Sequence, residues 1–208
     1  MAAIPLPETA AIAPMALFAV TALVLFLYDT VDPDSMNSEA LAGISVAGSL
    51  SVLVVTGWYL VAGTGQPPEG AITLFNGTLI VDGMALFFTA LIASVVMLVV
   101  IASYDYLKGM EKQAEFYSLV MLAATGMAMM SAANSLVTAF ISLELASLPS
   151  FALVAYLKHN KGSVEAGLKY FLIGALSSSI FVYGVSLVYV STGALQFDAV
   201  AAALVDPT

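Results

Sequence analysis

The chain alternates between long apolar runs and short polar breaks. A membrane-spanning helix needs about 20 mostly apolar residues, and about six stretches meet this requirement. They cover roughly residues 10–28, 40–62, 83–103, 116–132, 135–156 and 164–192. The pattern predicts an all-α polytopic membrane protein with about six transmembrane helices, in a single membrane domain over residues 1–208.

The breaks between these runs carry turn signals. Residues 131–135 (SAANS) leave room only for a tight hairpin between the fourth and fifth runs. Residues 63–82 combine glycine and proline turns with an alternating apolar segment interrupted by Asn76-Gly77, which predicts a β-hairpin. The C-terminal stretch LQFDAVAAALVDPT predicts a short interfacial helix or the beginning of a longer segment.

Lysines in the loops predict the orientation of the spans. Lys108 and Lys112 lie between the third and fourth spans, and Lys158 and Lys161 lie between the fifth and sixth. With six spans, both of these loops fall on one side of the membrane, and the loops on the other side contain no lysine. The positive-inside rule therefore predicts that the lysine loops are cytoplasmic and that both termini are outside.

The composition supports a membrane protein and limits its chemistry. Hydrophobic residues make up 61% of the chain and charged residues 9%, with a mean hydropathy of +1.02. The sequence contains no cysteine and a single histidine, His159, which excludes disulfides, thiolate metal sites and iron–sulfur clusters. One histidine cannot form a haem or zinc site unaided. We expect that the chain binds no metal or cofactor, and that quinone and redox centres belong to partner subunits.

The charge balance bears on partners and location. The net charge is −9, from 14 acids and five lysines with no arginine, which argues against nucleic acid as a partner. Such an acidic chain suits a high-salt organism. The N-terminus lacks the basic region of a secretory signal, so the first apolar run is predicted to be a retained span. We expect a multi-pass protein of a prokaryotic plasma membrane.

One acid lies deep in a predicted span. In FISLELASLPSFALVAY (140–156), Glu144 is roughly 14 Å from the outer end of its span and roughly 18 Å from the inner end. A charge at that depth costs about 3 kcal/mol on insertion scales, and such acids usually mark ion or proton paths. The structural alternative is a neutral glutamic acid that is hydrogen-bonded to a neighbouring helix.

Two neighbours of Glu144 add polar groups. Pro149 cannot donate to the carbonyl of Leu145, and Ser147, at i+3, places a hydroxyl on the face of Glu144. We expect the acid, the hydroxyl and the freed carbonyl to hold a short water chain. A plain packing kink is the alternative interpretation of Pro149.

Lys169 differs from the four loop lysines, because it lies about 8 Å inside the start of the sixth span. It either reaches the cytoplasmic surface and pairs with Glu165 at i−4, or serves as a proton-loading site. Its estimated depth is about 10 Å cytoplasmic of Glu144, so water or another residue is expected between them. Ser177, Ser178 and Ser179 in the same span are expected to serve close helix packing rather than chemistry.

Residues 115–195 resemble the antiporter-like N subunit of proton-pumping NADH:quinone oxidoreductase, the respiratory complex I type. The glutamate within ELASLP and the lysine within EAGLKYFLIGALSS carry the resemblance, and VDGMALFF and SYDYLKG extend it upstream. It implies the N-terminal part of an antiporter-like helix bundle. It further implies that Glu144 tunes the protonation of lysines along a hydrated axis at mid-membrane, and that Lys169 belongs to this axis. Redox energy from a hydrophilic arm is expected to drive changes in the pairing, and hence in the pKa of the lysines. Ser147, Pro149 and Glu165 are predicted to support this site.

The resemblance also predicts partners. Members of this family contain two inverted repeats, each with a broken helix, whereas this chain stops after the sixth span. We expect a truncated product, the N-terminal piece of a split gene or a fragment, which does not pump alone. The expected partners are other membrane-arm subunits, a missing C-terminal helix set and the lipid bilayer.

Three functions remain open from the sequence. The first is a membrane-arm subunit of a complex I-type oxidoreductase, using NADH or a related donor, that couples electron transfer to proton translocation without a redox centre of its own. The second is a subunit of a multisubunit sodium/proton antiporter, which has no redox step. The third is a non-pumping structural fragment. The EAGLKYF stretch favours the first.

Overall fold

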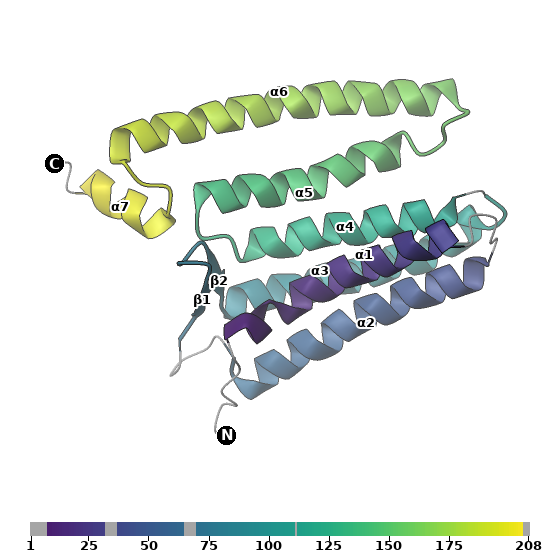
Figure 1. The fold of residues 1–208 in the computed structure, drawn as a ribbon, viewed down its shortest axis with the longest axis horizontal. Helices are drawn as coiled ribbons and strands as arrows, with labels where there is room; N and C mark the ends of the chain where they lie inside the picture. The colour runs from purple at the N-terminus through teal and green to yellow at the C-terminus, as the bar shows by residue number, and fades with distance from the viewer. Residues whose placement is uncertain (1–7, 32–36, 65–69, 111, 206–208) are drawn as a thin grey trace.

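The computed structural model of the chain describes residues 8–31, 37–64, 70–110 and 112–205 (Figure 1). These residues fold into long helices that run back and forth, with a small two-stranded sheet at one end. In chain order the elements are η1 (Glu8–Ile12), α1 (Ala13–Val31), α2 (Ser38–Ala62), β1 (Ile72–Leu74), β2 (Leu79–Val81), α3 (Gly83–Leu107), α4 (Gln113–Ser131), α5 (Leu136–Val154), α6 (Lys161–Thr192) and α7 (Phe197–Val205).

Six helices are long and apolar enough to cross a membrane, which confirms the predicted polytopic fold. The predicted ends differ from the observed ones by about one helical turn at most. The third helix continues from the predicted end at residue 103 to Leu107, and the sixth begins at Lys161 rather than at residue 164. Both differences add polar residues, because helical hydrogen bonding continues past the apolar run into the interfacial region.

Helices α1 to α4 form the most closely packed part of the bundle, and α5 and α6 are added to it in turn. Helix α4 packs against α1, α3 and α5, and α5 packs against α6. The largest fully buried side chains include Phe18, Leu25, Leu86, Tyr117 and Met121, all from the first four helices. In α6, by contrast, Gly167 is the one residue that is buried.

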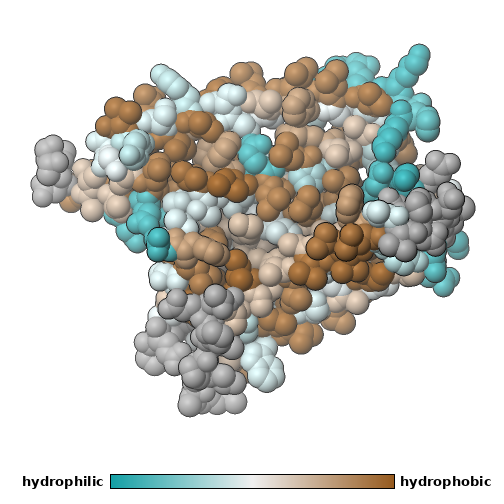
Figure 2. Space-filling view, in the orientation of Figure 1, coloured by the Kyte–Doolittle hydropathy of each residue, from teal (hydrophilic) through white to brown (hydrophobic). Residues whose placement is uncertain are grey.

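The surface pattern fits a bilayer environment. Apolar side chains cover the middle of the face shown in Figure 2, and hydrophilic residues gather at the end that carries the α5–α6 loop. Exposed large side chains include Leu98, Ile173, Leu176 and Val190. In water this much exposed apolar surface would be unfavourable, whereas in lipid tails it is solvated.

The predicted hairpin forms directly before α3. Strands β1 and β2 pair antiparallel, with Thr73 opposite Ile80. The turn between them has positive φ angles at Phe75 (50°), Asn76 (56°) and Gly77 (80°), and asparagine and glycine tolerate that conformation best. Asp82 then caps α3, because its Oδ1 accepts a hydrogen bond of 2.7 Å from the amide of Ala85.

Three segments far apart in sequence meet beside this hairpin, and we call them together the hairpin clasp: residues 72–81, 132–135 and 194–197. The amide of Ile80 donates to Ala132 O at 2.8 Å, and Asn134 Nδ2 donates to Gly77 O at 2.8 Å. Gln196 Nε2 donates to Asn76 O at 2.7 Å. The tight connection predicted at 131–135 is confirmed, and the clasp joins it to the end of α6.

The connections alternate between the two ends of the bundle. The hairpin, residues 132–135 and α7 lie at one end, and the α3–α4 and α5–α6 loops lie at the other (Figure 1). The lysine loops therefore share one end, as predicted. The described beginning and end of the chain share the opposite, hairpin end. The assignment of the lysine end to the cytoplasm remains a prediction.

Candidate functional site

Glu144 lies in the middle of α5, on the side that faces α6. Helix α5 begins after Ser135, whose side chain caps it by accepting a hydrogen bond of 3.1 Å from Thr138 N. The Glu144 side chain is half-buried. Its Oε1 accepts a hydrogen bond from the hydroxyl of Ser178 on α6. The acid is therefore held between two helices at mid-membrane by a neutral donor.

Ser178, which the sequence analysis grouped with Ser177 and Ser179 and assigned to helix packing, is in addition a hydrogen-bond partner of Glu144. A signal for it existed in the spacing of small residues along α6. Gly167, Gly174 and Ser178 follow each other at seven and four residues, a spacing that places them on one helical face. A Cβ on Gly167 would lie 2.5 Å from Ala155 Cβ, and one on Gly174 would collide with the Phe151 ring. These small residues therefore mark the face of α6 that meets α5.

We call the line of contact between α5 and α6 the seam. Further along this seam, Phe140 of α5 stacks on Phe181 of α6, with ring centroids 5.9 Å apart. Phe151 makes an edge contact with Tyr170 at 4.8 Å. The hydrogen bond between Ser178 and Glu144 thus lies between two aromatic contacts.

The two predicted supporting groups on α5 do not converge on the carboxyl. Ser147 Oγ is 3.4 Å from the backbone carbonyl of Glu144, not from its side chain. Helix α5 continues through Pro149, which is buried. The carbonyl of Leu145, which Pro149 cannot bond, lies beside α4, because a Cβ on Gly126 would be 2.7 Å from its carbon. A water chain through all three groups stays a prediction.

Lys169 is paired with Glu165 one turn earlier on α6. Lys169 Nζ is 2.5 Å from Glu165 Oε1, and the two side chains are 69% and 65% exposed. The pairing with Glu165 is the one that the first alternative named, and the role of Lys169 as a proton-loading site stays a prediction. The structure places Lys169 on the same helix as Ser178, with its ion pair directed to Glu165 rather than to Glu144.

A groove of about 390 Å³ lies between α4, α5 and α6 next to this site. Ser142, Ser147 and Ser150 of α5 contribute hydroxyls to its lining, opposite Met127 and Met130 of α4. The Ser142 hydroxyl is fully buried and has no hydrogen-bond partner among the described residues. Buried polar groups are normally satisfied by protein or water, so this serine provides a place where water can bind.

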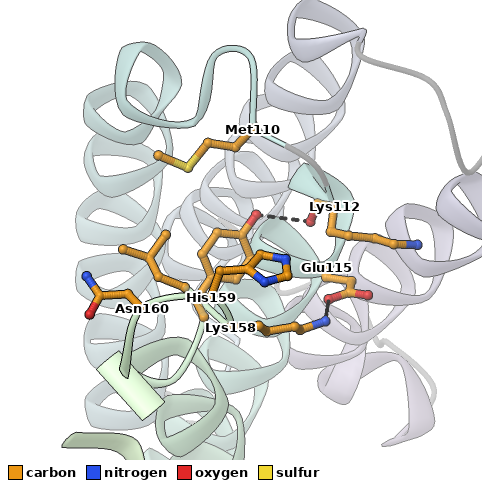
Figure 3. Close-up of a pocket in the computed structure, with 8 residues that line it drawn as sticks. Met110, Lys112, Glu115, Lys158, His159 and Asn160 are labelled. Atoms are coloured by element: carbon orange, nitrogen blue, oxygen red, sulfur yellow. Dashed lines mark hydrogen bonds and ion pairs between the residues drawn. The ribbon is translucent and has the colours of Figure 1, made fainter. Parts of the chain in front are cut away.

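A second hollow of about 510 Å³ opens at the lysine end (Figure 3). Within it, Lys158 Nζ forms an ion pair of 3.0 Å with Glu115 Oε2, and the Tyr156 hydroxyl donates to Lys112 O at 3.2 Å. His159 lies at its exposed rim. These contacts tie the start of α4 to the α5–α6 loop. The described residues contain no group of three or more acids and histidines that could hold a metal ion.

Two successive spans thus each carry an ionisable residue beside their contact region, Glu144 on α5 and Lys169 on α6. Residues 133–206 match the family described as NADH:quinone oxidoreductase/Mrp antiporter, transmembrane. Over most of its length, the chain is a homologue of NADH-quinone oxidoreductase subunit N. The resemblance stated from the sequence is confirmed.

Relatives with this name come from several organisms. The chain is 39% identical to subunit N of Rhodospirillum rubrum over 190 residues, which cover 90% of the chain and 37% of that protein. It is 33% identical to subunit N of Parvibaculum lavamentivorans, with coverages of 95% and 39%. It is 34% identical to the F(420)H(2) dehydrogenase subunit N of Methanosarcina mazei, with coverages of 91% and 38%. The chain thus spans about two-fifths of the length of these relatives.

Solved structures show the same arrangement of helices. A chain of respiratory complex I from Thermus thermophilus with bound aureothin superposes with a TM-score of 0.70 at 29% identity, covering 88% of this chain and 38% of that one. A chain of the membrane-bound sulfane sulfur reductase, an archaeal respiratory membrane complex, gives a TM-score of 0.73 at 25% identity, with coverages of 94% and 40%.

Proposed function

We propose that this chain is a membrane subunit of a complex I-type oxidoreductase, in which Glu144 exchanges protons as electron transfer proceeds in partner subunits. The observation that carries the proposal is the position of Glu144: at mid-membrane, half-buried, and hydrogen-bonded to a neutral hydroxyl rather than to a fixed cation. A carboxyl group without a permanent counter-charge can take up and release a proton at modest cost.

Lys169 is proposed as a second proton site. It lies about 8 Å inside the start of the sixth predicted span, and its ion pair with Glu165 is exposed on the surface of α6. An ion pair at membrane depth is unfavourable against lipid tails. We therefore propose that further helices, from a longer subunit or from another chain, cover this face of α6, and that they bring Lys169 and Glu144 into one hydrated path.

The partners follow from the same argument. The chain carries no cysteine and one histidine, so quinone reduction and the redox centres are proposed to belong to other subunits of the assembly. Subunit N relatives of bacteria and the Methanosarcina relative differ in the donor that their names state. The donor for this protein is thus proposed only as NADH or a related hydride carrier.

The test measures donor-driven proton uptake by inverted membrane vesicles that contain the assembled complex. Glu144→Gln keeps the size of the side chain but cannot exchange a proton, so uptake should fall by at least about tenfold. Glu39→Gln is the matched control, because Glu39 is exposed in the first turn of α2, and it should pump normally.

Two results would change this conclusion. Normal proton uptake by the Glu144→Gln complex would show that the acid has only a structural role. Sodium-dependent proton exchange in the absence of any electron donor would instead support the antiporter function, which the matching family also includes.

A further inference from the structure

Ser178 is the middle one of three consecutive serines, and the three differ in what they contact. Successive residues of a helix point about 100° apart, so one of the three can face α5 squarely. Ser178 does so and donates to Glu144 Oε1. Ser179 Oγ instead donates to Ala175 O of its own helix at 2.8 Å, and both Ser177 and Ser179 are exposed.

Aromatic contacts lie on both sides of Ser178 along the contact between α5 and α6. Toward the lysine end, Gly174 lets the Phe151 ring approach α6 closely. Toward the hairpin end, Phe140 and Phe181 stack with ring planes 17° apart. Between these contacts the half-buried Ser178 hydroxyl is the side-chain donor that the structure shows for the Glu144 carboxyl group.

We propose that Ser178 is a positioning residue for proton exchange at Glu144, which it holds against α6 in both protonation states. A serine hydroxyl can donate to a carboxylate and can accept from a carboxylic acid. It therefore follows the acid through loading and release without adding a charge to the seam. This inference rests on the proposed function of Glu144.

The experiment uses the assembled complex in inverted vesicles and compares variants that differ in the hydroxyl alone. Ser178→Thr and Ser178→Val introduce side chains of nearly equal shape, of which only threonine can bond to Glu144. Ser177→Ala and Ser179→Ala remove the neighbouring hydroxyls as controls. We expect proton uptake per electron to fall about three- to tenfold in Ser178→Val, because one hydrogen bond is worth about 1 kcal/mol. Ser178→Thr and both controls should stay close to the unmodified complex.

An infrared difference spectrum provides a reading that a packing defect alone would not produce. The carboxyl C=O band that disappears in Glu144→Gln identifies the acid. In Ser178→Val this band should move to higher wavenumber, because the protonated carboxyl group loses its hydrogen bond with the serine hydroxyl, and in Ser178→Thr it should stay in place.

The outcomes separate this inference from the proposed function. If Glu144→Gln abolishes uptake while Ser178→Val leaves both the rate and the band unchanged, the positioning role is wrong and the proton site stands. If Glu144→Gln leaves uptake unchanged, the proposed function itself fails. Equal losses in the threonine and valine variants would assign Ser178 to packing and would overturn the inference.

Discussion

At the scale of the residue, a close contact between the backbones of α4 and α5 fixes the position of α5, the helix that carries Glu144. Gly126 of α4 faces the main chain of α5 so closely that a Cβ there would collide with Ala146 N and lie 2.8 Å from Ser142 O. Backbone atoms cannot move aside as a flexible side chain can. Glycine is needed at this position because α4 and α5 touch there.

This contact predicts that adding one methyl group lowers the stability of the chain at Gly126 but not at Gly184. Gly126→Ala should lower the stability of the chain by about 1–3 kcal/mol, the usual cost of overpacking. Gly184→Ala in α6 is the matched control, since no atom lies within 4 Å of its added Cβ, and it should be neutral or slightly stabilising. Thermal unfolding of the purified chain in detergent measures both. Equal melting temperatures for the two variants would contradict the assigned contact.

Single residues also show which parts of the candidate site could be predicted from the sequence. Glu144 was identified because a lone acid in a long apolar run is conspicuous. Ser178 was assigned to packing alone, because the apolar run of α6 has no periodicity that shows which of three adjacent serines faces α5. The stripe of Gly167, Gly174 and Ser178 contained that information, but only as a spacing of small residues.

At the scale of the element, the hairpin clasp holds the ends of α3, α4, α5 and α6 together. Its hydrogen bonds join positions up to 120 residues apart, from Gln196 to Asn76. Asn134 is central, because its side chain bonds to Gly77 O while its backbone bonds to Thr78 O and to Phe197 N. The hairpin itself was predictable from Asn76-Gly77, whereas its partners were not, since turn signals are local and the clasp is not.

The clasp should loosen when its side-chain hydrogen bonds are removed. Asn134→Ala deletes the bond to Gly77 O, at a cost of about 1 kcal/mol. Amide hydrogen exchange should then become faster in residues 72–81 and 194–197, while the helices α1 and α2 keep their protection. Thr78→Ala is the control, because its hydroxyl bonds only to Phe75 within the same turn. Unchanged exchange in Asn134→Ala would show that the backbone bonds suffice.

At the scale of the whole molecule, the six spans were predictable because a bilayer imposes a minimum length of apolar sequence. Their order of packing was not, since lipid-facing and helix-facing positions are equally apolar in this chain. The groove between α4, α5 and α6 follows from that packing and could not be anticipated. The lysine bias predicted which loops share an end, and the structure agrees.

The predicted orientation can be tested with single cysteines, because the natural chain contains none. His159→Cys lies at the exposed lysine end, and Asp198→Cys lies exposed on α7 at the hairpin end. A membrane-impermeant maleimide added to intact cells should label position 198 and not position 159, and inverted vesicles should give the reverse. Buried Ala124→Cys is the unlabelled control. Labelling of position 159 in intact cells would place the lysine loops outside.

The fit of Gly126 against α5 also limits how the site can rearrange during turnover. With main chain against main chain between Ser142 and Ala146, α4 and α5 cannot slide or rotate past one another without collision, so they behave as one rigid wall. Helix α6 is more exposed, but Gly167 and Gly174 bring it equally close to Ala155 and to the Phe151 ring of α5. These contacts, together with the hairpin clasp at the other end of α6, oppose a shear of α6 along α5. The architecture therefore favours proton exchange by side-chain rotation, with the Ser178 hydroxyl kept beside the Glu144 carboxyl group.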